Sequence, residues 1–296
     1  MPPLPSLRTQ VRALLLPALT GLALLLGTAP AEAAPAPLPV VNMGAVVSAA
    51  QVEGYRGNQA GLGDDASTRL VQRALTARGY RVTADGHYGR ATTKAYTQYQ
   101  RSLGYRSIDA NGIPGPASLT RLGRGRFTVA NVVQVGSRKD KYGTKRVNTR
   151  TKQMLAAADA QVPWTIQVSQ GSYCKLEKHC AAASSGTHDG GGALDIRVSD
   201  LSTTKRWQTV RALRSVGFAA WLRTPGQCGG CWPYHIHVIA IGDTDVWQSN
   251  GKYTNRDQVA DYYVGRNGLA GHARDNTPVQ YRVPFTTWER VLVAGS

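Results

Sequence analysis

The spacing of apolar side chains predicts a small helical unit in the first half of the chain. Within Ser67–Arg78 the apolar residues recur three and four positions apart, which places them on one face of a helix. Ala91–Leu103 repeats this spacing, and Ala117–Leu122 gives a third and shorter helix. We therefore expect a compact three-helix domain over residues 64–123.

A different pattern marks the second half of the chain. Ala193–Val198 and His235–Ile241 are short, largely apolar runs, which are typical of buried strands. Between them, Thr204–Val216 has apolar residues at helical spacing and predicts a helix that covers a sheet. The second half therefore reads as an α+β domain over residues 147–296, with a small antiparallel sheet and flanking helices.

The first 33 residues have the pattern of a secretory signal. Arg8 and Arg12 precede the apolar stretch Ala13–Gly27, and Ala31–Ala33 has the small residues of a cleavage site. The apolar stretch is shorter than the ~20 residues that a membrane span needs. We expect export and no stable membrane insertion after cleavage, and the alternative is an uncleaved N-terminal anchor.

Two connecting segments complete the organisation. Residues 34–63 are rich in Ala, Pro and Gly and predict a flexible arm. Residues 124–146 are basic and contain Gly, so we interpret them as a linker, with a possible short strand in Phe127–Val135. The two predicted domains thus lie on either side of a basic connection.

The net charge of the chain limits the classes of partner that it can bind. Lys and Arg number 35 against 18 Asp and Glu, which gives a net charge of +17. A cation of this size is attracted to polyanions such as nucleic acid, acidic membranes or an anionic cell wall. Export and the lack of an aromatic-basic motif exclude nucleic acid as the partner. We therefore expect a secreted protein that associates with the cell wall. We also expect it to be a monomer. The 42% hydrophobic content excludes a wholly disordered chain.

The four cysteines fall into two close pairs. Outside the cytosol thiols tend to form disulfides, and four cysteines allow three connectivities. The short separations favour Cys174 with Cys180 and Cys228 with Cys231. The alternative is a four-cysteine zinc site, but only the second pair has the required CxxC spacing.

The helical unit contains an internal repeat. The sequence ADGHYGRAT at 84–92 recurs 26 residues later as ANGIPGPAS at 110–118, and each copy is a Gly-rich turn that leads into a helix. Together with LVQRALTARGYRV, these residues resemble the type-1 peptidoglycan-binding domain over Leu70–Leu122. The resemblance implies attachment to bacterial wall glycopeptide. The alternative is a structural helix bundle without a ligand.

Four polar residues of the second half suggest a metal site. His188 and Asp195 are separated by six residues, and His235 and His237 follow on the second predicted strand. Residues two apart on a strand point to the same side, so His235 and His237 project together. Asp195 is flanked by apolar residues on the first strand, and an unpaired buried carboxylate is costly unless a cation compensates it. The glycines at 190–192 allow the chain to bring His188 back beside Asp195.

Two imidazoles and one carboxylate are a usual ligand set for catalytic zinc. We therefore predict one Zn²⁺ held by His188, Asp195 and His237, with His235 free to move protons or stabilise an oxyanion. Zinc in such a site activates water and polarises a scissile carbonyl.

This pattern resembles the LAS metallopeptidases, whose shared signature is His…Asp and His-x-His around one zinc. SGTHDGGGALD is similar to the D-Ala-D-Ala carboxypeptidase branch, and the resemblance extends over Val147–Ile241. It implies that His188, Asp195 and His237 bind zinc and that His235 has a catalytic role. It also implies a peptidase that cuts a stem-peptide amide, most naturally a D-Ala-D-Ala bond.

One departure leaves the general base open. Many members of that branch have an acid three residues before the last histidine ligand, and Tyr234 stands there in this chain. His235 is the substitute candidate and Asp189 a second one, so exopeptidase and endopeptidase action both stay open. Gln170 in SQGSYC is a candidate for holding the substrate backbone, although a strand-end turn explains the same residues.

The sequence thus predicts a secreted, zinc-dependent peptidoglycan hydrolase. Two alternatives remain at this point. One is a catalytically inactive wall-binding protein, and the other is an endopeptidase that acts on another stem or cross-bridge bond.

Overall fold

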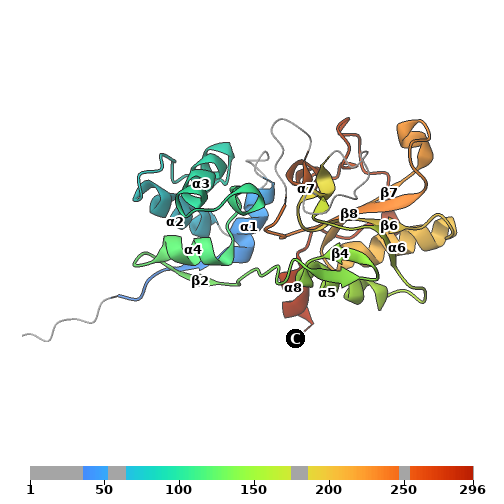
Figure 1. Cartoon of the computed structure of the whole chain (residues 1–296), viewed down its shortest axis with the longest axis horizontal. Helices are drawn as coiled ribbons and strands as arrows, with labels where there is room; N and C mark the ends of the chain where they lie inside the picture. The colour runs from blue at the N-terminus through green and yellow to red at the C-terminus, as the bar shows by residue number, and fades with distance from the viewer. Residues whose placement is uncertain (1–35, 53–64, 175–185, 247–253, 296) are drawn as a thin grey trace, which may run out of the picture. The chain divides into compact units, whose positions relative to one another are not determined.

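The computed structural model describes residues 36–52, 65–174, 186–246 and 254–295 (Figure 1). The described residues from Leu38 onward belong to one compact unit, which contains all the elements below. The predicted signal segment at 1–33 and Cys180 lie outside the described residues. Among the described residues, no helix combines the length and the hydropathy that a membrane span needs.

The three predicted helices are present. They are α2 (Asp65–Thr76), α3 (Arg90–Ser102) and α4 (Pro116–Gly123), which lie together in Figure 1. A short 3₁₀ turn, η2 (Ser107–Ala110), precedes α4. Their apolar faces form one core, which includes Val71, Leu75, Tyr96, Tyr99, Leu119 and Leu122. The helical periodicity therefore predicted both the elements and their buried faces.

The segment predicted as a flexible arm is partly folded, and the structure corrects that prediction. β1 (Val40–Asn42) pairs in parallel with β2 (Thr128–Ala130), and α1 (Met43–Gln51) follows it directly. Oδ1 of Asn42 caps α1 by accepting from the backbone N–H of Ala45 at 3.2 Å. The apolar residues of 40–51 join the helical core, so burial orders a stretch whose composition resembles a linker.

The basic connection is also structured. β2 lies within the predicted 127–135 segment, and β3 (Asp140–Tyr142) forms an antiparallel hairpin with β4 (Lys145–Val147). Nε of Arg146 donates to the carbonyl of Arg138 at 2.7 Å. The connection between the two predicted domains is therefore held by backbone pairing, and it is not a free linker.

The predicted small antiparallel sheet is confirmed. It has the strand order β5-β6-β8-β7, and all three neighbouring pairs are antiparallel. The strands are β5 (Gln167–Gln170), β6 (Ala193–Arg197), β7 (Phe218–Arg223) and β8 (His235–Ala240). Leu194, Ile236 and Ala220 lie on one face, in a core with residues of α5 (Thr149–Asp159) and α6 (Thr203–Ser215).

The opposite face of the sheet carries the polar residues singled out in the sequence. It is covered in part by α7 (Asn255–Tyr263), whose Val259 and Tyr262 pack with Trp221 of β7. α8 (Trp288–Ala294) follows, and Glu289 in its first turn pairs with buried Arg150 of α5 at 2.7 Å. α7, in the C-terminal segment to which the sequence assigned no role, thus builds part of the site-bearing face, whereas Trp288 of α8 packs on the core of α5 and α6.

One of the two predicted disulfides is confirmed. Cys228 and Cys231 are bonded beside the 3₁₀ turn η6 (Pro225–Cys228), directly before β8. Cys174 is also disulfide-bonded, and its predicted partner Cys180 falls outside the described residues. Because bonded sulfurs are not free thiolates, these cysteines do not form a zinc site.

Candidate metal centre

The strand register brings four site residues into one row across the sheet. Gln170 pairs with Asp195, Asp195 with His237, and His237 with Trp221. Residues directly opposite one another in a sheet point to the same face. The pairing of β6 with β8 by itself makes the carboxylate of Asp195 and the imidazole of His237 neighbours.

His188 reaches the same place from outside the sheet. It lies in the 3₁₀ turn η5 (Thr187–Asp189), and the three glycines that follow lead the chain into β6. Gly192 has a φ of +80°, and a Cβ there would lie 3.0 Å from the side chain of Asp243. Only glycine suits both the backbone conformation and the close approach. The resulting turn buries His188, which is 2% exposed.

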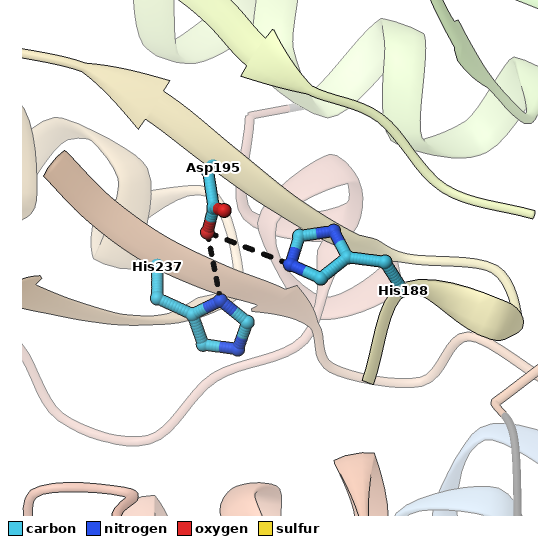
Figure 2. Close-up of side chains that lie close together, drawn as sticks. All are labelled: His188, Asp195 and His237. Carbon is cyan, nitrogen blue, oxygen red and sulfur yellow. Dashed lines mark hydrogen bonds and ion pairs between the residues drawn. The ribbon is translucent and has the colours of Figure 1, made fainter. Parts of the chain in front are cut away.

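The three predicted ligands converge. Nδ1 of His237 lies 2.9 Å from Oδ1 of Asp195, and Nε2 of His188 lies 3.5 Å from the same oxygen. One ligand atom from each of the three residues falls within 4.8 Å of the other two. Figure 2 shows both imidazoles directed at one carboxylate oxygen. Residues 49 positions apart in the chain thus form a single cluster.

The outer nitrogen of each imidazole is held by an acceptor. Nδ1 of His188 lies 3.0 Å from the carbonyl of Gly171, and Nε2 of His237 lies 3.0 Å from Oε1 of Gln258. The amide of Gln258 is oriented by its own Nε2, which donates to the carbonyl of Gly268 at 3.1 Å. Because a carbonyl oxygen only accepts, both outer nitrogens carry hydrogen.

This arrangement determines what the cluster can bind. With hydrogen on the outer nitrogens, a neutral His188 and a neutral His237 each direct a lone pair toward Asp195, which is itself an acceptor. Three acceptors facing one another require a cation between them, either protons or a metal ion. In metalloproteins, two imidazoles and a carboxylate are a usual donor set for Zn²⁺, and carbonyl acceptors commonly orient such histidines through their outer nitrogens. The residues therefore fit the predicted metal.

The electrostatics agree with a cation site. Burial raises the pKa of Asp195, but hydrogen bonds and charge from the two histidines outweigh it and hold the pKa well below its usual range. Burial lowers the pKa of His237, the nearby His188 lowers it further, and the opposing effect of Asp195 does not reverse the shift. For His188 the carboxylate outweighs burial and raises the pKa. The ionised carboxylate of Asp195 thus lies between two histidines whose pKa values shift in opposite directions, upward for His188 and downward for His237.

His235 lies at the edge of the cluster. Its Nε2 is 3.9 Å from Oδ1 of Asp195, and its Nδ1 is 2.9 Å from the carbonyl of Pro233. The ring of Trp232 packs edge-on against it, with 5.7 Å between centroids. Two arginines flank it in the strand register, Arg197 on β6 and Arg223 on β7. His235 is therefore close to the three predicted ligands without belonging to their group.

Three further residues singled out in the sequence differ in position: Tyr234 at the place of the missing acid, Asp189 as the second candidate base, and Gln170 as the candidate for holding substrate. The guanidinium of Arg206 lies over the ring of Tyr234, 4.0 Å from its centroid, and Tyr234 is among the exposed large side chains. Asp189 lies beside His188 in the turn, and its charge is a minor cause of the raised pKa of His188. Gln170 lies in the row of Asp195, and its Nε2 is 4.0 Å from Sγ of Cys174.

Two residues outside the predicted site set shape the cluster. Trp221 stacks on His237 at an interplanar angle of 15°, and its Nε1 donates to the carbonyl of Arg266 at 2.9 Å. The strand Phe218–Arg223 is buried throughout, so no alternation along it marks Trp221 as a site residue. Gln258 had no sequence signal either, since only the packing of α7 brings it to His237.

Comparison with known families identifies the helical part. Residues 64–122, about a fifth of the chain, match the peptidoglycan binding domain family. A comparison of the sequence with curated proteins gave no significant match. The chain therefore carries a peptidoglycan-binding domain, which supports association with the cell wall. The peptidase resemblance of the second half stays a prediction.

Proposed function

We propose that this chain is a secreted peptidoglycan hydrolase whose second half is a zinc-dependent peptidase. Its substrate would be a stem-peptide amide, with a D-Ala-D-Ala bond as the first choice. The observation that carries the proposal is the cluster of His188, Asp195 and His237, whose acceptor atoms converge while their outer atoms are fixed. A buried cluster of titratable residues that shift one another's pKa values is a usual sign of a functional site.

In this proposal the three clustered side chains hold Zn²⁺, which when bound supplies a Lewis acid for the carbonyl and an activated water. Gly171 and Gln258 keep the two imidazoles in the tautomers that leave the inner nitrogens free. His235 moves a proton at Nε2, because it is adjacent to the ligands and its Nδ1 is held by the carbonyl of Pro233.

The helical domain supports the choice of substrate. A peptidoglycan-binding domain on the same chain keeps the peptidase near its polymer and raises the effective substrate concentration. The predicted signal at 1–33 would place both domains outside the cell, where that polymer lies. The net charge of +17 suits an anionic envelope.

The test is incubation of the purified mature protein with pentapeptide muropeptides, followed by mass analysis of the products. We expect release of the terminal D-Ala, loss of the activity with a chelator, and its return when Zn²⁺ is added. His188→Ala serves as the inactive control. Internal cleavage would instead favour the endopeptidase alternative. A zinc-loaded protein that releases no product from any stem or cross-bridge peptide would contradict the proposal and favour an inactive wall-binding protein.

A further inference from the structure

The two copies of the internal repeat have the same hydrogen bonds inside the helical domain. The backbone N–H of Gly86 donates to Oε1 of Gln72 at 2.9 Å, and that of Gly112 donates to Oε1 of Gln100 at 2.8 Å. Both glycines have positive φ angles, +82° and +79°. The two turns are therefore structural equivalents, and any difference between them is informative.

The residue before each glycine builds its turn in the same way. Oδ1 of Asp85 accepts from the N–H of His87 at 2.9 Å, and Oδ1 of Asn111 accepts from the N–H of Ile113 at 2.9 Å. An acid and an amide thus serve equally well inside the turn. The choice of Asn in the second copy must have another reason.

That reason lies in the amide nitrogen of Asn111. Nδ2 donates to the carbonyls of Thr244 and Val246, at 2.8 and 3.0 Å, and both bonds are buried. An ionised Asp has no hydrogen to donate, so the first copy lacks this ability. Ile113, which is 1% exposed, shares a core with Val246, whereas its counterpart His87 is only partly buried.

Further contacts fasten the same segment. Gln51 of α1 donates through Nε2 to the carbonyl of Asp243 at 3.0 Å and accepts at Oε1 from the N–H of Gly242 at 2.8 Å. The guanidinium of Arg138 bridges Asp109 and Asp245, at 2.6 and 2.7 Å. Residues 242–246, which follow β8 after Ile241, are thus held from several directions by the helical domain and the connection.

We propose that the two repeat copies have separate tasks, with the second copy docking on residues 242–246 and the first copy binding peptidoglycan. The first turn borders a hollow of about 220 Å³ lined by Thr83, Asp85, His87, Arg90 and Thr92 among others. Val82, Gly89 and Ala91 complete the lining, and its polar side chains can hydrogen-bond the hydroxyl and amide groups of a glycopeptide. The inference deepens the peptidoglycan binding indicated by the family match and does not depend on peptidase activity.

Docking is tested by hydrogen exchange of a peptide that contains residues 240–246. Asn111→Asp keeps the turn acceptor but removes both donors and places a carboxylate against two carbonyls. We expect exchange of this peptide to become about tenfold to a hundredfold faster, because opening becomes easier. Asp85→Asn is the matched control and leaves exchange unchanged. Asn111→Ser, which replaces the two amide N–H donors by one hydroxyl on a shorter side chain and adds no charge, covers the case in which Asn111→Asp does not fold.

Wall binding is tested by sedimentation with purified insoluble peptidoglycan. Arg90→Ala, at an exposed position on the hollow, should reduce the bound fraction several-fold and leave the exchange of 240–246 unchanged. Asn111→Asp should pellet like the unchanged protein. Loss of pelleting in Asn111→Asp with full pelleting in Arg90→Ala would overturn the division of tasks. Unchanged exchange in both Asn111 variants would overturn the docking. Neither readout depends on cleavage, so failure of the peptidase proposal is a separate outcome.

Discussion

Oε1 of Gln258 lies 3.0 Å from Nε2 of His237, so a helix near the C-terminus fixes the tautomer of a histidine in the central sheet. The amide of Gln258 cannot turn over without losing its bond to the carbonyl of Gly268. α7 is therefore part of the candidate metal centre, although the sequence assigned no role to residues 255–296. Support of this kind sets the orientation and the affinity of a ligand histidine.

The first prediction concerns this support. Gln258→Ala should weaken Zn²⁺ binding by about 10–100-fold, since His237 loses the acceptor that orients it. Competition with a chelating indicator measures the affinity. Gln280→Ala changes a glutamine at an exposed position and should bind zinc like the unchanged protein. Equal affinity in both variants would show that Gln258 does not act on the metal.

The second prediction separates ligands from the adjacent histidine. His188→Ala, Asp195→Ala and His237→Ala should each lose bound zinc, because each removes one of three converging donors. His235→Ala should keep the metal and lose turnover by about 10²–10⁴-fold, the usual contribution of a proton-transfer group. Metal content by elemental analysis and muropeptide turnover are measured on the same samples. Zinc loss in all four variants would contradict the separate role of His235.

The third prediction concerns metal removal and stability. Without a cation, the lone pairs of His188 and His237 face the Asp195 carboxylate, so the apoprotein should unfold at a lower temperature. Free zinc at a hundred times its dissociation constant should add about 2.7 kcal/mol to the free energy of unfolding. Calorimetry with and without zinc measures the shift. In Asp195→Ala zinc should have little effect, and an equal shift there would mean binding elsewhere.

The fourth prediction concerns Asp243, which lies in the segment that docks on the helical domain. Burial and the charge of Asp245 raise the pKa of Asp243 to about 6, although Arg150 and the hydrogen bond from Asn148 oppose the shift. A carboxyl whose folded-state pKa is raised stabilises the fold below its unfolded pKa. That stabilisation is lost as the pH rises through about 6.

Asp243→Asn removes this titration. Relative to the unchanged protein, the variant should gain roughly 2.4 kcal/mol in the free energy of unfolding between pH 4 and pH 7. Denaturant unfolding of both proteins at the two pH values gives the double difference, in which the other titrating groups cancel. A difference that does not vary with pH would contradict the raised pKa of Asp243.

The sequence predicted the elements that rest on local periodicity. The helices α2, α3 and α4 lie within two residues of their predicted bounds, as do β6 and β8. The flexible-arm prediction for 40–51 was wrong, because its apolar residues have no pattern until β2 and the helical core give them partners. Composition reports only on the segment itself, whereas residues 40–51 are ordered by contacts with residues far away in the chain.

The candidate site likewise has one part that the sequence predicted and one part that only the folded structure determined. Side-chain alternation on β8 and the His188–Asp195 spacing were enough to name the three converging residues, since ligand chemistry and strand geometry are local properties. The bond from Gln258 to His237 and those from Asn111 to residues 244 and 246 were beyond the sequence. They join segments far apart in the chain, and only packing of the folded molecule decides which distant donor meets which acceptor.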